Sequence, residues 1–135
     1  MNTEDLAIKL SEVSSLEGST FECLPIPGDF DVLQITVNGI EELPVFLNVT
    51  SEQILCISYL FGEDEINADK RTDLLETMLE MNIPVPLSAF SKIGDRYVIF
   101  GALAVSSSFD DIVHELITLN ENAVEALDVL SEYLQ

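Results

Sequence analysis

The chain has 135 residues, of which 25 are acidic and 5 basic, so its formal net charge is -20 although 47% of its residues are hydrophobic. This hydrophobic share excludes an intrinsically disordered chain, and the length predicts a single domain over residues 1–135. The scarcity of cations excludes direct nucleic-acid binding and recruitment to anionic membranes, because both depend on Lys and Arg.

Neither a targeting segment nor a membrane span is indicated. Residues 1–5 (MNTED) lack the basic segment and the apolar stretch of a secretory signal, and no apolar run reaches the roughly 20 residues that cross a bilayer. We therefore expect a cytoplasmic protein without membrane insertion. Cys23 and Cys56, 33 positions apart in apolar segments, have neither a metal-ligand nor a redox spacing and are expected to be buried, reduced and inert.

The first half of the chain predicts one helix followed by four strands in a meander. Apolar residues at helical spacing indicate the helix, which Gly18 closes. Pro25 and Pro27 confine the first strand to a sheet edge, and the fourth strand, apolar on both faces, is typical of a central one. The predicted elements are a helix at 3–16 and strands at 20–27, 31–38, 43–49 and 53–61.

The second half predicts a helix, a hairpin and a long final helix. Gly94-Asp95 is a hairpin turn signal, and Gly101 in the second hairpin strand indicates a bulge or a helix packed close over the backbone. Ser108 caps the final helix, which is long enough to require either a bend near 120–122 or an end lying against another element. The predicted elements are a helix at 69–81, strands at 87–93 and 96–105, and a helix from 109 to about 134.

This order predicts an α+β fold, with an antiparallel sheet of five to six strands and the helices on one face. The α-β-β-β-α-β-β-α order resembles the type III secretion chaperone-like fold. That resemblance implies a protein usually found as a dimer.

The sequence offers little that could carry catalysis. The one histidine, His114, lies in the final helix beside its apolar face, and Ser106 to Ser108 form a strand-to-helix connection without a GxSxG pattern. Glycine-rich phosphate loops are also missing from the sequence. We therefore expect no enzyme activity, no catalytic, cofactor-binding or metal-ligating residues, and no cofactor.

An acidic run before the helix at 69–81 leaves two interpretations open. Glu63, Asp64, Glu65, Asn67 and Asp69 offer the oxygen ligands that hard cations prefer. The glycine precedes the run, however, whereas an EF-hand needs it at the sixth loop position. We favour a solvated connection that places negative charge before a helix N-terminus, with weak divalent-cation binding as the alternative.

Four of the five cations fall in the middle third of the chain. They either form one less negative face or pair with neighbouring carboxylates, and we favour pairing because carboxylates outnumber them so heavily. These residues are Lys70, Arg71, Lys92 and Arg96.

Several segments resemble the YjfI family of small acidic bacterial proteins, a domain of unknown function. The resemblance spans about 20–134, and because the family has no established activity it supplies no site residues. It implies a cytoplasmic bacterial protein, with family members often associated with proteins similar to PspA, a membrane-stress factor. The segments that carry it are 43–47 (LPVFL), 53–61 (QILCISYLF), 82–88 (NIPVPLS), 111–116 (DIVHEL) and 122–127 (NAVEAL).

Two functional hypotheses follow. The first is a protein-binding adaptor or chaperone-like protein that holds a partner, such as a PspA-like protein, on an exposed sheet face or the final helix, with its acidic surface steering basic partners. The apolar stripe of that helix also predicts a homodimer. The alternative is a small-molecule or divalent-cation binding protein, with Glu63, Asp64, Glu65 and Asp69 as its candidate residues. Mimicry of nucleic acid by the acidic surface is a third possibility.

Overall fold

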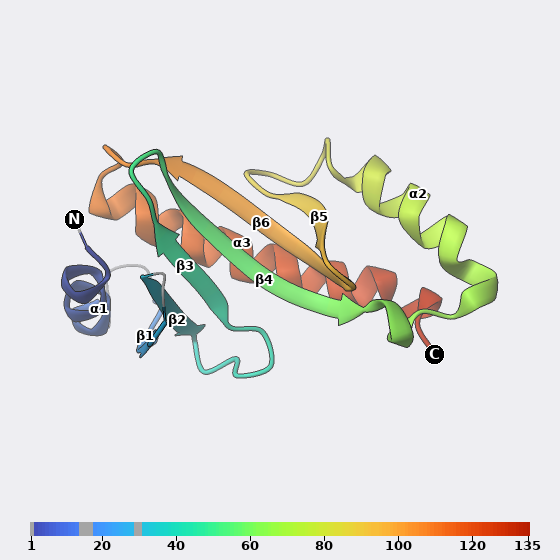
Figure 1. Cartoon of the computed structure of the whole chain (residues 1–135), viewed down its shortest axis with the longest axis horizontal. Helices are drawn as coiled ribbons and strands as arrows, with labels where there is room; N and C mark the ends of the chain where they lie inside the picture. Colours follow the sequence, from blue (N-terminus) through green and yellow to red (C-terminus); the bar gives the residue numbers. More distant parts are fainter. Residues whose placement is uncertain (1, 14–17, 29–30) are drawn as a thin grey trace.

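A computed structural model describes residues 2–13, 18–28 and 31–135, and these form a six-stranded antiparallel sheet with three α-helices (Figure 1). The predicted α+β fold is confirmed, and the sheet has the upper number of strands expected. The elements are α1 (Thr3–Glu12), β1 (Phe21–Ile26), β2 (Val32–Val37), β3 (Val45–Val49), β4 (Gln53–Gly62), α2 (Arg71–Met81), β5 (Ala89–Ile93), β6 (Arg96–Ala104) and α3 (Phe109–Leu130), with single 3-10 turns at Glu63–Glu65, Ala68–Lys70 and Ser131–Tyr133.

The strands follow the order β1-β2-β3-β4-β6-β5. The first four strands form the predicted meander, with β1 at one edge and β4 in the interior between β3 and β6. The β5–β6 hairpin turns at Gly94-Asp95 as expected, and Gly94 has a φ of 60°. Strand β5 is the other edge, so the two sheet edges come from the first and the fifth strand in chain order.

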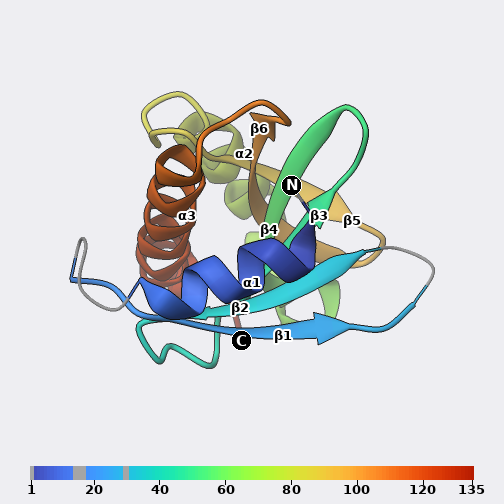
Figure 2. The ribbon, with the colours of Figure 1, turned by 90° about the vertical axis from the view of Figure 1, so that its left-hand side faces the viewer.

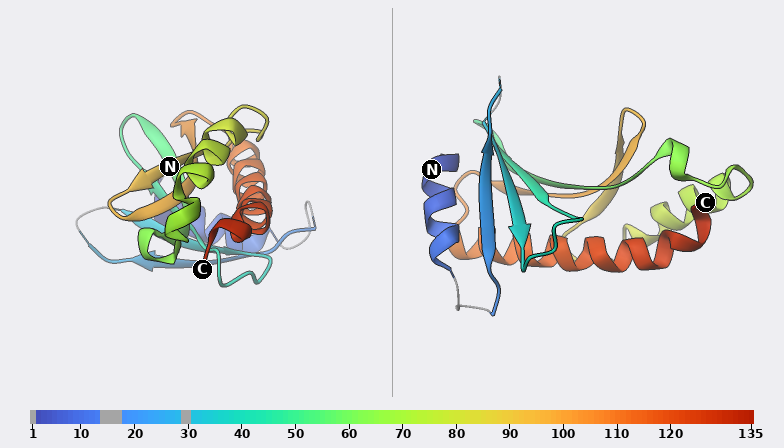
Figure 3. Two further views of the ribbon diagram at one scale, coloured as in Figure 1. Left: turned by 90° about the vertical axis from the view of Figure 1, so that its right-hand side faces the viewer. Right: turned by 90° about the horizontal axis from the view of Figure 1, so that it is seen from below.

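The hydrophobic core lies between the sheet and helices α1 and α3, and Leu74 and Met78 of α2 also belong to it. Helix α3 runs along β4 and β6, while α1 packs on β1 and β2 (Figures 1 and 2). Helix α2 lies at the opposite end of the molecule from α1, next to β5 (Figure 3). Alternate residues of the inner strands, such as Leu33, Ile35 and Val37 of β2, point into this core and are almost fully buried.

Helix α3 continues through 120–122 and ends at Leu130. The chain beyond it lies against the connection after β4: Tyr133 and Glu65 accept backbone hydrogen bonds from Asn67 and Gln135, at 2.9 Å each. The second of the two predicted alternatives, an end lying against another element, is therefore the one observed. Ser108 caps the helix as predicted, since its Oγ accepts the N–H of Asp111 at 3.1 Å.

The apolar stripe of α3 is buried inside the chain. Its members pack against β4 and β6, so the stripe is not available to a second copy, and the reason given above for a homodimer is wrong. The buried members are Ile112, Val113, Leu116, Leu119, Ala123, Ala126 and Leu130.

Two local expectations need adjustment. Helix α1 ends at Glu12, and the last positions of the predicted helix, 14–16, lie outside the described residues. The register irregularity of the sheet lies between Tyr59 and Phe61 in β4, whereas Gly101 keeps its place opposite Cys56. Among the described residues, none of the helices combines the length and apolarity that crossing a membrane requires.

Candidate functional site: a groove between α2 and β5

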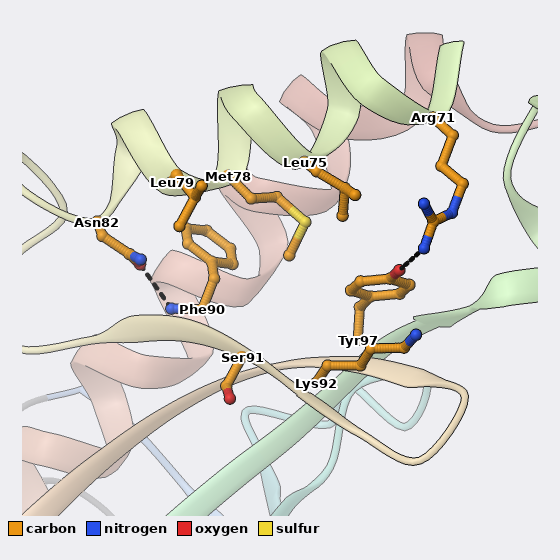
Figure 4. Close-up of a pocket in the computed structure, with 9 residues that line it drawn as sticks. All are labelled: Arg71, Leu75, Met78, Leu79, Asn82, Phe90, Ser91, Lys92 and Tyr97. Carbon is orange, nitrogen blue, oxygen red and sulfur yellow. Dashed lines mark hydrogen bonds between the residues drawn. The ribbon is translucent and has the colours of Figure 1, made fainter. Parts of the chain in front are cut away.

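An open apolar groove lies between helix α2 and the β5–β6 hairpin (Figure 4). Its volume is about 320 Å³, and side chains from both elements point into it. The walls are largely apolar, while the charged side chains Arg71 and Lys92 lie at the end opposite Asn82. The lining residues are Arg71, Leu75, Met78, Leu79, Asn82, Phe90, Ser91, Lys92 and Tyr97.

The groove exists because α2 has more apolar residues than the core can cover. Leu74 and Met78 are buried, but Leu79, one position further round the helix, is 68% exposed. The connection after the helix, which starts next to the lining residue Asn82, also exposes apolar side chains, with Ile83 92% exposed and Leu87 59% exposed. Large apolar side chains this exposed, beside an apolar hollow, are characteristic of a protein-interaction surface.

Asn82 holds the edge strand at the base of the groove. Its Oδ1 accepts the backbone N–H of Phe90 at 2.7 Å (Figure 4). Because β5 is an edge strand, this N–H points away from the sheet and would otherwise be open to another chain. The Asn82 amide therefore occupies one backbone donor of the edge strand that a further strand could have used, whereas the groove itself remains open.

A closed ionic network occupies the other end of the groove. Arg71 donates to Glu63 through Nη2 at 2.8 Å and through Nε at 3.1 Å, and Lys92 Nζ lies 3.5 Å from the same carboxylate. Tyr97 donates its hydroxyl to Glu63 at 3.2 Å. The hydrogen bond from Arg71 is the main reason that the pKa of Glu63 falls to about 2. Since Glu63 already forms ion pairs with Arg71 and Lys92, these two cations do not form an empty anion site at this end of the groove.

The predicted pairing of the cations is confirmed for Arg71 and Lys92. Lys70 instead donates to the carbonyl oxygen of Glu132 at 2.9 Å, and the Arg96 guanidinium lies 5.4 Å from the ring centre of Tyr59. The described residues provide no ion pair for these two.

The acidic run does not converge on one point. Glu63 belongs to the ionic network, while Glu65 accepts the backbone N–H of Gly62 at 2.6 Å and so caps a short turn. Asp64 and Asp69 are exposed. Within residues 2–13, 18–28 and 31–135, no group of three or more His, Cys, Asp or Glu side chains could hold a metal ion. Weak cation binding by this run therefore remains a prediction without a preformed site.

The other singled-out residues lie apart from the groove and from one another. His114 is exposed on α3. Cys56 is buried and its pKa rises to about 12 through burial, whereas Cys23 is only half-buried, with a pKa of about 11 from the same cause. The expectation that both cysteines are buried is thus correct for Cys56 and too strong for Cys23. Both cysteines are free.

One polar residue of the core was not singled out from the sequence. Glu115 of α3 is 3% exposed, lies over Gly101 of β6, and has an Oε1 atom with no hydrogen-bond partner among the described residues. Burial raises the pKa of its carboxyl, and the nearby His114 lowers it by less. The available signal was Gly101, which indicated a closely packed helix, and that alternative is the one observed.

The sequence over residues 1–134 matches the family described as "Uncharacterized protein conserved in bacteria (DUF2170)". The chain belongs to this family. The DUF2170 chain is 24% identical over 127 residues to the Escherichia coli K12 protein named "Uncharacterized protein YjfI", covering 92% of this chain and 95% of that relative. The resemblance to YjfI is therefore confirmed.

Two solved structures share the fold of the DUF2170 chain. One is the heterodimeric ExoU–SpcU complex of the type III secretion system of Pseudomonas aeruginosa, with a TM-score of 0.59, 14% identity, and coverage of 78% of this chain and 86% of that one. The other is the ExsC–ExsE complex, with the same TM-score and identity and coverage of 96% and 97%. At this identity the likeness shows the fold alone, and it confirms the predicted secretion chaperone-like topology.

Proposed function

We propose that this protein is a protein-binding adaptor with a chaperone-like role, and that the α2–β5 groove receives apolar side chains of its partner. The observation that carries the proposal is the open groove flanked by Leu79 and Ile83, which are 68% and 92% exposed. Burying such side chains stabilises a complex by about 1.5–3 kcal/mol each. The similar structures, each determined as a complex of two proteins, support a binding role.

The charge distribution favours particular partners. The ionic end of the groove is already neutralised by Glu63, so the groove itself selects apolar side chains. The remaining surface carries most of the net charge of -20 and favours the approach of partners with basic residues outside the apolar segment. The proposal includes no catalytic step, and it places the protein in the cytoplasm.

Two finer parts of the proposal concern the identity of the partners. A PspA-like protein is the first candidate to titrate, because the resemblance to the YjfI family implies that association. Self-association as a homodimer is the second part, implied by the resemblance to the secretion chaperone-like fold. The identity of the partner and the homodimer are independent of one another, so either can fail alone.

Direct binding with a matched pair of variants tests the groove. A partner retained at high salt from native lysate, or a purified PspA-like protein, is titrated by calorimetry against the wild type, Leu79→Glu and Leu24→Glu. Both leucines are exposed, at 68% and 58%, but Leu24 lies on the opposite edge strand β1. We expect Leu79→Glu to weaken the partner Kd by about 10-fold or more and Leu24→Glu to leave it unchanged.

Other outcomes would contradict the role of the groove. If both variants bind as the wild type does, the partner contacts another surface. If a small apolar compound from a ligand screen raises the melting temperature of the wild type but not of Leu79→Glu, the groove is a small-molecule site, since about 320 Å³ lies at the lower end of the range of such pockets.

A further inference from the structure

The face of the sheet opposite α3 has an unusual composition. Strands β3, β4 and β6 pass in front of α3 in Figure 1, and on this outer side none of the described helices covers them. The strand pairing places side chains in rows across this face, for example Phe46, Ile57 and Phe100. The outward positions of β2 to β6 are Val32, Gln34, Thr36, Phe46, Asn48, Gln53, Leu55, Ile57, Tyr59, Ala89, Ser91, Ile93, Arg96, Val98, Phe100, Ala102 and Ala104.

This outer face is apolar without belonging to the core. On β4 and β6 the outward residues are almost all apolar, and Phe46 and Tyr59 form an edge-to-face pair with ring centres 5.7 Å apart. Val98 is 1% exposed, but neither it nor the other outward side chains belong to the core cluster formed by the described residues, which lies on the α3 side. A sheet with one solvated face normally alternates apolar inward and polar outward residues, so this face has the composition of a covered one.

Acidic residues are missing from the outer face as defined above. The chain has 25 Asp and Glu residues in 135, yet the outward positions of β2 to β6 include none of them, and Arg96 is the one charged residue there. Glu42, in the connection before β3, reaches a hollow at one end of the face, and among the strands Glu22 on the edge strand β1 is the nearest outward carboxylate. The negative charge is therefore concentrated away from this face.

We propose that a second copy of this chain packs sheet to sheet on the outer face. Two copies that each carry a charge of -20 repel one another wherever carboxylates meet, and a face without carboxylates avoids that cost. The exposed small residues Ala102 and Ala104 allow the close approach that packed sheets require. A basic partner, by contrast, gains little here, because the outward positions of β2 to β6 offer it no carboxylate.

The rim of the outer face can be self-complementary. Arg96, Glu42, Phe46 and Tyr59 line a shallow hollow at one end of it. In a dimer with two-fold symmetry the second copy presents the same four residues, so each copy brings one carboxylate, Glu42, and one guanidinium, Arg96, to the interface. This inference rests on the proposed homodimer and adds the surface through which it forms.

Sedimentation velocity of the full chain over a concentration series tests the inference. We expect a dimer whose Kd falls several-fold between about 0.05 M and about 0.5 M NaCl, because salt screens the repulsion between two acidic copies. Ala102→Glu places a carboxylate in the outer face and should raise the dimer Kd by about 30-fold or more. Ile83→Glu, at an exposed position after α2, is the matched control and should leave the dimer Kd unchanged.

The outcomes separate the surface from the proposed function. A monomer at every concentration and salt removes both the homodimer and this inference. A dimer lost in Ile83→Glu but kept in Ala102→Glu places self-association near α2 and overturns the outer-face interface alone. Circular dichroism verifies folding, and if Ala102→Glu is unfolded, Ala104→Glu on the same face replaces it. Neither result changes the Leu79→Glu test of the groove.

Discussion

Helix α3 packs closely over Gly101 of β6. A Cβ atom at this position would lie 1.7 Å from Glu115 Oε1 and 3.1 Å from the carbonyl oxygen of Leu87. Only glycine therefore lets β6 pass beneath the carboxyl of Glu115. The cost of this arrangement is a buried acid without a full set of hydrogen bonds, which is unfavourable when the acid is charged.

The pH dependence of stability should reveal Glu115. Burial raises the pKa of Glu115 above 4.5, so the folded chain holds this proton after the unfolded chain has lost it. The contribution of this proton to the free energy of unfolding is fully present below about pH 4.5. It is lost as the pH rises through the folded-state pKa, and the free energy of unfolding then falls by at most about 1.4 kcal/mol per pH unit. Urea unfolding of the wild type and Glu115→Gln should therefore diverge with rising pH, in favour of Glu115→Gln.

The exposed Glu121→Gln on the same helix is the control for this pH series. It carries the same loss of charge without the burial, so its unfolding free energy should run parallel to that of the wild type. The charged and titratable neighbours, His114 on α3 and Cys56 on β4, are kept in all three proteins. Parallel curves for Glu115→Gln and the wild type would show that Glu115 has an ordinary pKa.

A double-mutant cycle tests the contact itself. Gly101→Ala should lower the free energy of unfolding by about 1–3 kcal/mol, because the new methyl group meets the carboxyl. In a Glu115→Ala background the same change should cost at least about 1 kcal/mol less, and the carbonyl oxygen of Leu87 accounts for the remainder. Equal costs in both backgrounds, measured by urea unfolding, would mean that Glu115 does not limit the space at Gly101.

At the scale of elements, α3 organises the connection between α2 and β5. Asn122 is 9% exposed, and its Nδ2 donates to the carbonyl oxygen of Pro86 and to Ser88 Oγ, at 2.9 Å each. Asn120, one half-turn away, is likewise buried and donates to the carbonyl oxygen of Leu43 at 3.3 Å. These amides explain why polar residues interrupt the apolar pattern of the helix without bending it.

Removing the Asn122 amide should loosen this connection. Asn122→Ala removes the donor from the buried Ser88 hydroxyl and from the part-buried carbonyl of Pro86, and we expect it to lower the free energy of unfolding by about 1–3 kcal/mol. Hydrogen exchange should rise first in the segment 82–88, which the amide holds. Glu121→Ala, at the exposed neighbouring position, should change neither quantity. An equal effect of the two substitutions would show that the helix backbone, and not the amide, is responsible.

The sequence predicted those elements whose signals are local. The Ser108 cap, the Gly94-Asp95 hairpin and the apolar strand β4 each follow from residues close together in the chain. The groove between α2 and β5 could not be predicted in this way, because it depends on how far α2 lies from β5 after folding. The role of the α3 stripe was misjudged for a related reason, since periodicity gives an apolar face but not what covers it.

At the scale of the whole molecule, the net charge should oppose folding. Carboxylates outnumber cations by five to one, and in the described residues the ion pairs involve only Glu63. Compacting so many like charges destabilises the folded state, and added salt screens that repulsion. The melting temperature, measured at one low protein concentration to limit self-association, should rise by about 5 °C between about 0.02 M and about 0.5 M NaCl.

The same measurement separates screening from a specific cation site. In about 0.5 M NaCl the repulsion between carboxylates is already screened. Millimolar CaCl₂ or MgCl₂ should therefore not raise the melting temperature further through screening. A ligand that binds the native state stabilises it by an amount that grows with the ratio of ligand concentration to Kd, so an additional rise would indicate a divalent site. In that case, substituting Asp64 and Asp69 by Asn should abolish the extra rise if the acidic run provides it. Glu63 is left unchanged because it holds Arg71 and Lys92 at the groove.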